Sequence, residues 1–258
     1  MVRPKKHLGQ HFLTDNNIAQ KIVDCLDPSY SDVCEIGPGT GVLTLPLLRK
    51  PHIKNLKAIE IDIDSIKHLN ENLHDDRLTI IEADFLRLNI DIIFTTPFAI
   101  IGNFPYNIGS QIFFKVLENR NRIPQVVGMI QKEVAERIAA PHGNRTYGIM
   151  SVLLQSWYDI EYCFTVNENV FNPPPRVKSA VIRLTRNKTE ELDCDEKLFF
   201  SVVKTGFNQR RKTLRNALRP ILPNIVQADH FFFSQRAEQL SPAQFVELTQ
   251  VVERILSE

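Results

Sequence analysis

The residues VCEIGPGTG at positions 33–41 join a short apolar run to a loop that carries three glycines within five residues. The apolar run predicts a buried strand, and the residues at 42–49 predict a helix after the loop. Glycines at such a junction let the backbone turn sharply, and they leave no side chain between the backbone and a ligand. The segment therefore indicates an α/β fold with a ligand-binding loop. A tight strand–helix turn also needs glycine for structural reasons, so the loop alone leaves both interpretations open.

The alternation of strand and helix continues outward from this loop. Apolar or β-branched runs predict strands at 33–37, 55–62, 78–84, 98–103 and 126–131. Helical stretches are predicted at 16–26, 42–49, 64–73, 110–118 and 132–139. Continuous apolar strands separated by helices are typical of a parallel sheet that is covered on both faces.

Two further predicted strands, at 158–166 and 179–185, have no helix between them, because their connection contains Asn172-Pro173-Pro174-Pro175. They fit antiparallel strands at one edge of the sheet. A polar segment at 187–196 follows. Beyond it only helices are predicted, at 196–206, at 209–219 and after a capping box at Ser241-Pro242-Ala243-Gln244. We therefore expect an α/β domain at 1–187 and a small all-helical domain at 188–258.

The composition is that of an ordinary globular protein, with 43% hydrophobic and 24% charged residues in 258. No apolar stretch approaches 18 residues and no secretory signal is visible, so we expect a cytoplasmic monomer without a membrane contact. The cysteines, Cys25, Cys34, Cys163 and Cys194, are scattered and are expected to be reduced thiols. The histidines form no metal-binding motif, so no metal is expected.

Cations concentrate between positions 204 and 219, where six lysines and arginines occur without an acid. In a helix at 209–219, Arg211, Arg215 and Arg219 would share one face. Such a run indicates a polyanionic partner such as RNA, although a solvated face paired with the acidic segment 190–196 remains an alternative. The candidate RNA-binding residues are Arg210, Arg211, Lys212, Arg215 and Arg219.

Two carboxylates at strand ends point to a nucleoside ligand for the loop that contains Gly37 and Gly39. Glu60 ends the second strand, 23 residues after Gly37, where an acid can accept hydrogen bonds from ribose hydroxyls. Asp84 ends the third strand, where an acceptor can meet an adenine amino group. Either acid alone would also fit a solvated strand end.

The loop favours S-adenosylmethionine over a dinucleotide. A dinucleotide loop would carry glycine at its sixth position, which is Val42 in this chain. We also expect Glu35, which precedes the loop, to repel a pyrophosphate and to tolerate the cationic methionine moiety.

The tetrapeptide Asn103-Phe104-Pro105-Tyr106 follows the fourth strand and suggests methylation of an exocyclic amine on a base. The Asn103 side-chain oxygen and the Phe104 carbonyl can each accept a hydrogen bond from one N–H group of the amine. These two hydrogen bonds free the nitrogen lone pair for the methyl group. Pro105 fixes the turn, and Tyr106 offers a ring on which the base stacks. Catalysis would then consist of positioning and electrostatics. As a bare tetrapeptide, the same residues would also fit a simple proline turn.

These motifs resemble the ribosomal RNA adenine dimethylases of the KsgA/RsmA family nearly end to end. The matching stretches are 7–13, 35–41, Glu60, Asp84, 103–106, 131–134, 170–181, 207–216, 236–238 and 240–241. The N-terminal motifs are shared with the antibiotic-resistance (Erm) methylases of large-subunit rRNA. The segments PPPRVKSA at 173–180 and FNQRRK at 207–212 are more specific to the small-subunit branch.

The resemblance implies a Rossmann-like methyltransferase domain that uses S-adenosylmethionine. The implied reaction is N6,N6-dimethylation of two adjacent adenosines near the 3′ end of 16S rRNA in the small ribosomal subunit, with a role in subunit biogenesis. The resemblance assigns cofactor contacts to His11, Leu13, Gly37, Glu60, Asp84 and Asn103. At position 11 the family usually has asparagine, and a histidine there can still donate to the methionine carboxylate.

The resemblance also places Phe171 opposite Tyr106, so that the two rings would sandwich the target base. From the residues alone, Phe171 fits better as a core aromatic that anchors a polyproline II loop.

Other functions are compatible with parts of the pattern. An assembly or nucleic-acid-binding factor without essential catalysis could keep the fold, but it would tolerate loss of the tetrapeptide acceptors, which are present here. An Erm-type large-subunit methylase shares the N-terminal motifs. A DNA adenine methylase would usually carry proline in place of Phe104. An rRNA adenine dimethyltransferase is therefore the favoured function.

Overall fold

The computed structural model of the chain describes residues 2–226 and 229–257. These residues form two compact units. The first consists of Met1–Ala135 and Ile160–Arg186, and the second of Glu136–Asp159 and Asn187–Glu258. Among the described residues, no helix is long and apolar enough to cross a membrane.

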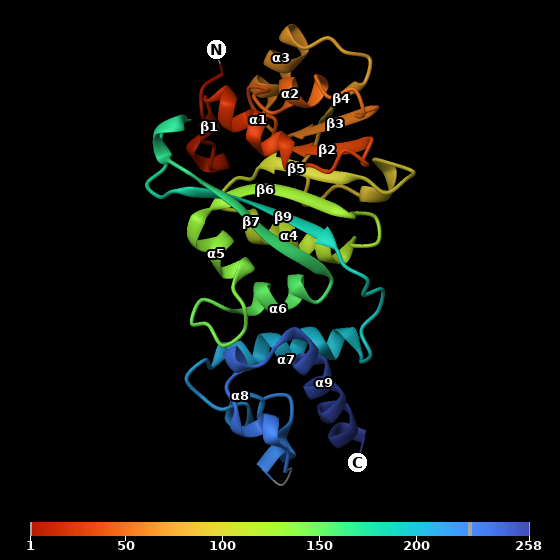
Figure 1. Ribbon diagram of the computed structural model, residues 1–258, viewed down its shortest axis with the longest axis vertical. Helices are drawn as coiled ribbons and strands as arrows, with labels where there is room; N and C mark the ends of the chain where they lie inside the picture. The colour runs from red at the N-terminus through yellow and green to blue at the C-terminus, as the bar shows by residue number, and fades with distance from the viewer. Residues whose placement is uncertain (1, 227–228, 258) are drawn as a thin grey trace. The chain divides into compact units, whose positions relative to one another are not determined.

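The first unit contains a seven-stranded sheet in the order β4-β3-β2-β5-β6-β9-β7 (Figure 1). Its strands are β2 (Asp32–Ile36), β3 (Asn55–Glu60), β4 (Leu78–Glu82), β5 (Ala99–Asn103), β6 (Gln125–Gln131), β7 (Tyr158–Val166) and β9 (Ser179–Arg186). Strands β2 to β6 pair in parallel, and β9 pairs antiparallel with β6. The predicted strands and their mostly parallel arrangement are confirmed, and β7 is an edge strand as expected.

Helix α1 (Asn16–Asp24) precedes β2, and three further helices connect parallel strands: α2 (Thr44–Leu48), α3 (Ile63–Asn72) and α4 (Gly109–Glu118). All four lie within two residues of their predicted ends. Local capping explains two of the starts. Asp15 accepts hydrogen bonds from the backbone of Asn17 and Ile18, and Asp62 accepts one from Asp64. Apolar faces of α1 and α2 are buried with the sheet in one core cluster.

A two-stranded sheet, which the sequence did not predict, ties the N-terminal segment to the connection between β7 and β9. In it β1 (Phe12–Leu13) pairs antiparallel with β8 (Phe171–Asn172). Leu13 lies opposite Phe171, and both side chains are buried in the core cluster. The pairing fixes the residues just before β1 next to the main sheet.

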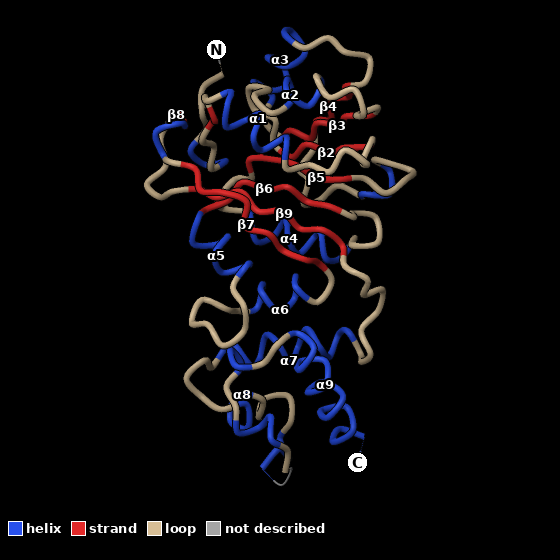
Figure 2. Tube along the Cα trace, viewed as in Figure 1, coloured by secondary structure: helices blue, strands red, loops and turns tan. Residues whose placement is uncertain are grey.

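The second unit is built mainly from helices (Figure 2). It contains α6 (Ile149–Gln155), α7 (Glu196–Asn208), α8 (Leu214–Ala217), α9 (Pro242–Ser257) and the last part of α5 (Lys132–Ala139). The predicted capping box forms at the start of α9, where Ser241 and Gln244 exchange side-chain-to-backbone hydrogen bonds.

The segment 136–159 belongs to this second unit, although the sequence pattern predicts a first domain over 1–187. The physical reason is the apolar surface of α6 and of the turn after it. Val152 and Leu153 are buried, and Trp157 packs its ring edge-to-face against Phe199 of α7. A boundary read along the chain does not reveal that an earlier helix completes a later core.

The predicted helix at 209–219 is wrong. Helix α7 runs to Asn208, residues 209–213 form a turn closed by a hydrogen bond from Lys212 N to Gln209 O, and α8 spans only Leu214–Ala217. The backbone of Gln209 leaves the helical region, with φ −123° and ψ 55°. The four-residue spacing of the arginines therefore does not place them on one helix face.

Candidate active site

The carboxyl ends of the parallel strands surround a cavity, which we call the main pocket. The N-terminal segment 8–12 and the ends of β2, β3, β4 and β5 line it. Nine residues predicted from the sequence meet at this pocket: His11, Gly37, Gly39, Glu60, Asp84, Asn103, Phe104, Pro105 and Tyr106.

The glycine loop has the backbone conformation that requires glycine. Gly37 and Gly39 have φ values of 66° and 56°, in the left-handed region. A Cβ on Gly39 would lie 2.8 Å from the ring of Phe12, so this position must stay bare for the N-terminal segment to pack. Around Gly37 the space is open within 4 Å, and a ligand can approach the backbone there.

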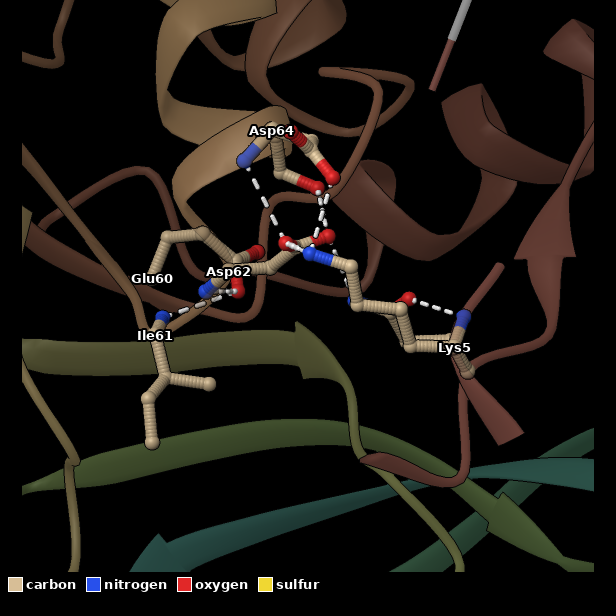
Figure 3. A network of polar contacts seen from close by, with 7 residues as sticks. Lys5, Glu60, Ile61, Asp62 and Asp64 are labelled. Atoms are coloured by element: carbon tan, nitrogen blue, oxygen red, sulfur yellow. Dashed lines mark hydrogen bonds and ion pairs between the residues drawn. The ribbon is translucent and has the colours of Figure 1, made fainter. Parts of the chain in front are cut away.

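Glu60 holds the glycine loop and the turn after β3 in place, and Figure 3 shows it beside Ile61 and Asp62 of that turn. Its Oε2 accepts from Gly39 N at 3.0 Å, and its Oε1 accepts from Ile61 N and Asp62 N at 2.9 Å each. Burial raises the pKa of Glu60, and the backbone hydrogen bonds oppose that shift. Because a carboxylate offers about four acceptor positions, about one remains for a ligand hydroxyl.

Asp62 anchors the N-terminal segment to the same turn. Its buried carboxylate binds Lys5 Nζ (Figure 3). It also accepts from Gln10 Nε2 at 3.2 Å and from Ser65 Oγ at 3.0 Å. Burial opposes ionisation, but the hydrogen bonds from Lys5, Gln10 and Ser65 outweigh it and lower the pKa of Asp62. This network positions the segment that lines the main pocket, and no pattern in the sequence predicts it.

Glu35 does not have the predicted role. Its side chain is buried away from the main pocket and accepts a hydrogen bond from Thr44 Oγ1 at 2.7 Å. Burial raises its pKa to about 8. The group is therefore largely a neutral acid at neutral pH, and it presents no charge to a ligand.

This protonated acid predicts a pH-dependent stability. Folding raises the pKa of Glu35 from an ordinary 4.5 to about 8, so its favourable contribution is complete below about pH 4.5 and is lost as pH rises through about 8. Glu35→Gln should remove a slope of at most about 1.4 kcal/mol per pH unit from the free energy of unfolding in that range. Denaturant titrations of both proteins between about pH 5 and pH 8 measure this, and identical slopes would contradict the assignment.

The tetrapeptide Asn103-Phe104-Pro105-Tyr106 is held by contacts at Asn103 and at Phe104. Asn103 Nδ2 donates to the His11 carbonyl at 2.8 Å, which fixes the amide so that its oxygen is left for another donor. Phe104 is buried, and its ring lies against Gly102 and Gly128, where added Cβ atoms would come within 2.8 and 2.6 Å of it. The glycines of two strands thus make room for the ring that orients the tetrapeptide backbone.

Tyr106 lines the main pocket, whereas Phe171 belongs to the buried core cluster. Tyr106 places its hydroxyl 2.5 Å from Ser179 Oγ, and burial raises the pKa of this phenol. Phe171 is 4% exposed in the core cluster and lines neither pocket at the active site. Leu13 is also buried and does not line the main pocket. Phe171 therefore has the core position that its residue type alone indicated.

Asp84 lines the main pocket at the end of the third strand. Its Oδ1 accepts from Leu86 N at 2.9 Å, and its Oδ2 lies 3.5 Å from Arg87 Nε. The side chain is one-third exposed, so the carboxylate retains room for a further donor. No group of three metal-binding side chains occurs among the residues that the structure describes.

The predicted RNA-binding residues divide into two groups, all within the second unit. Arg210 donates to the carbonyls of Arg145 and Tyr147, and Arg215 donates to the carbonyl of Ile225 at 2.9 Å. These two arginines therefore hold the fold of the unit. The remaining three, Arg211, Lys212 and Arg219, are exposed, as is Arg210, so Arg210 differs from them by its two carbonyl partners.

The pocket fits a nucleoside-bearing cofactor: an open glycine turn, an acceptor left on Glu60 and an acid at Asp84 converge on it. Fold and site together define a Rossmann-like methyltransferase that uses S-adenosylmethionine. Comparison with known proteins narrows this class. The chain belongs to the ribosomal RNA adenine dimethylase family, whose sequence model matches residues 1–254. It is thus an rRNA adenine dimethyltransferase.

Similar proteins of known name agree with this family. The chain is 56% identical to ribosomal RNA small subunit methyltransferase A of Parabacteroides distasonis, over 99% of this chain and 96% of that protein. It is 54% identical to the protein of that name from Flavobacterium johnsoniae, over 98% and 97%. A dimethyladenosine transferase from Plasmodium falciparum has a similar structure, with a TM-score of 0.79 and 23% identity over 95% of this chain and 98% of that one.

Proposed function

We propose that this enzyme dimethylates N6 of two adjacent adenosines near the 3′ end of 16S rRNA within the small ribosomal subunit, as a cytoplasmic monomer with a role in subunit biogenesis. The observation that carries the proposal is the oriented Asn103 amide at the main pocket, because the bond to His11 leaves its oxygen as an acceptor for an amine. The names of the relatives support the small subunit as the target.

The chemistry follows from acceptors at the end of β5. The amine of adenine is a poor nucleophile because its lone pair is delocalised into the ring. Asn103 Oδ1 and the Phe104 carbonyl each accept a hydrogen bond from one of its N–H groups, which favours a tetrahedral nitrogen. Pro105 fixes the turn, and Tyr106 stacks on the base. S-adenosylmethionine supplies an electrophilic methyl group when it is bound. The residues proposed to hold it are His11, Leu13, Gly37, Gly39, Glu60, Asp84 and Asn103, with Leu13 acting through its backbone because its side chain is buried.

The exposed cations of the second unit are proposed to bind rRNA phosphates. Arg211, Lys212 and Arg219 are free to reach solvent, whereas Arg210 and Arg215 are engaged with backbone carbonyls. Phosphate contacts position an RNA without reading its sequence, which suits an active site that holds a single unstacked base. Phe171 has no proposed contact with the base, since it is buried in the core.

Reversing two of these charges tests the RNA surface. Three phosphate contacts give a slope of log affinity against log salt of about −2 to −3. Arg211→Glu with Lys212→Glu should lower the affinity for small-subunit particles and bring that slope to about −1, because two contacts are lost. Filter binding at several salt concentrations measures both quantities.

Arg215→Met is the matched control for that double variant. It should lower the melting temperature, because Arg215 donates to Ile225 O and lies over the ring of Phe233. The double variant should melt as the wild type does, since Arg211 and Lys212 are exposed. A folded double variant with wild-type affinity and salt slope would exclude this surface from RNA binding.

The function itself is tested by incubating the enzyme with labelled S-adenosylmethionine and undermethylated small subunits, and by mapping the modified nucleotides. Two adjacent dimethylated adenosines near the 3′ end of 16S rRNA are expected. Large subunits serve as the control, and transfer to them instead would indicate the Erm-type reaction. Tight binding to small subunits without any methyl transfer would indicate an assembly factor without catalysis.

A further inference from the structure

A second pocket, which we call the side pocket, adjoins the main pocket in the first unit. Gly9, Gln10, His11 and Tyr106 line both pockets. On its other side the side pocket is bounded by Lys6 and the loop 173–177. Lys6 and Arg176 are exposed cations, and no Asp or Glu is among the described residues that line this pocket. The side pocket therefore favours the approach of a polyanion.

His11 and Tyr106 form the aromatic part of the wall between the two pockets. Their ring centroids are 5.4 Å apart, with an interplanar angle of 28°. The His11 Nδ1 lies 2.8 Å from the Pro173 carbonyl oxygen, and the Tyr106 hydroxyl lies 2.5 Å from Ser179 Oγ. Each ring is thus held by a hydrogen bond of its own, and one face of Tyr106 is covered by the imidazole.

A base cannot enter between these rings as they stand. Stacked rings have centroids about 4.5–7 Å apart, so a base inserted between the two would separate them to about 9 Å or more. A base that reaches Asn103 from the side pocket and uses this face of Tyr106 must therefore displace the imidazole. The hydrogen bond to Pro173 and the stack on Tyr106 are the two contacts that it has to replace.

We propose that His11 is a gate for the target adenine, a role that rests on the proposed function. In the RNA-free enzyme its imidazole covers Tyr106. When RNA binds, the extruded adenine arrives from the side pocket, takes the imidazole's place on the Tyr106 ring and brings its amine to Asn103. His11 is here a positioning residue that restricts which rings reach Tyr106, because only a ring that stacks better than imidazole displaces it. This role is additional to any contact of His11 with the cofactor.

The gate lowers the apparent affinity for RNA by the fraction of enzyme that is open. His11→Asn removes the ring and should lower the KM for undermethylated small subunits about 3- to 10-fold, as expected if about 10–30% of the wild type is open. His11→Phe keeps a ring on Tyr106 but loses the hydrogen bond to Pro173, so it should lower the KM less than His11→Asn does. His7→Asn is the matched control, because His7 is exposed and lines neither pocket. Calorimetry with S-adenosylmethionine separates any change in cofactor affinity from the change in KM.

A second measurement observes the ring itself. The Cε1–H signal of His11, assigned by its absence in His11→Asn, should be displaced by the Tyr106 ring current in the free enzyme. Saturating single-stranded RNA with two adjacent adenosines should move it toward the position of an exposed histidine such as His7. An unchanged or raised KM in His11→Asn, or a His11 signal that does not move at saturation, would overturn the gate. Absence of methyl transfer by the wild type would instead overturn the proposed function.

Discussion

Asn103→Ala is expected to lower turnover about 100- to 1,000-fold, the loss typical when one preorganised group that stabilises a transition state is removed. The Asn103 oxygen matters most when the amine becomes tetrahedral, so the KM for small subunits should change much less than kcat. Because Asn103 Nδ2 also donates to His11 O, the variant loosens the N-terminal segment. The Kd for S-adenosylmethionine should therefore rise, but less than about tenfold. Single-turnover methyl transfer and calorimetry measure the two effects.

Asn103→Asp distinguishes the role of the amide oxygen as an acceptor from the role of the amide nitrogen as a donor. An aspartate keeps an acceptor for the amine and loses the donor to His11 O. If the acceptor carries catalysis, this variant should turn over at least about ten times faster than Asn103→Ala. Equal rates for both variants, or a rate for Asn103→Ala within tenfold of the wild type, would remove the oxygen from the mechanism.

The sheet was predictable because its strands are continuous apolar runs and its junctions carry glycine. The run at 33–37 became β2 at Asp32–Ile36, and the run at 126–131 became β6 at Gln125–Gln131. The parallel order follows because such strands are buried on both faces and need helical connections. The meeting of Gly37, Glu60 and Asn103 at one pocket then follows from the common direction of the strands.

Tertiary contacts account for what the sequence did not reveal. The charge spacing at 209–219 resembles a helix, but Arg210 binds the carbonyls of Arg145 and Tyr147, and Arg215 binds Ile225 O. Partners 65 and 10 residues away are invisible to a local pattern. The anchoring of Lys5 and Gln10 on Asp62 is invisible for the same reason, since it joins residues more than 50 positions apart.

Burial explains why Glu35 and Phe171 do not have the ligand-facing positions considered from the sequence. Glu35 precedes the glycine loop, and from the sequence its charge appeared available to a ligand. In the fold its side chain turns to Thr44, and its pKa rises to about 8. Phe171 pairs with Leu13 across the small β1–β8 sheet. This sheet could not be predicted from hydrophobic periodicity, because each of its strands has only two residues.

Glu60→Ala should weaken S-adenosylmethionine binding about 10- to 100-fold. A hydrogen bond from a ribose hydroxyl to this carboxylate is charge-assisted and contributes about 1.5–3 kcal/mol. The carboxylate also organises the pocket before the cofactor binds, because it accepts from Gly39, Ile61 and Asp62. Calorimetry gives the affinity, and binding to small subunits, which we propose to depend on exposed cations of the other unit, should be retained.

Because Glu60 also holds backbone groups in place, its replacement should affect the stability of the cofactor-free protein as well. Alanine leaves three backbone N–H groups without their acceptor, so the cofactor-free variant should melt below the wild type. Glu60→Gln does not restore the site, because both carboxylate oxygens accept backbone hydrogens and either orientation of the amide sets an NH₂ against an N–H donor. Glutamine should therefore resemble alanine in cofactor affinity. A Glu60→Gln enzyme with wild-type affinity would show that the carboxylate neither holds the glycine loop nor meets the ribose.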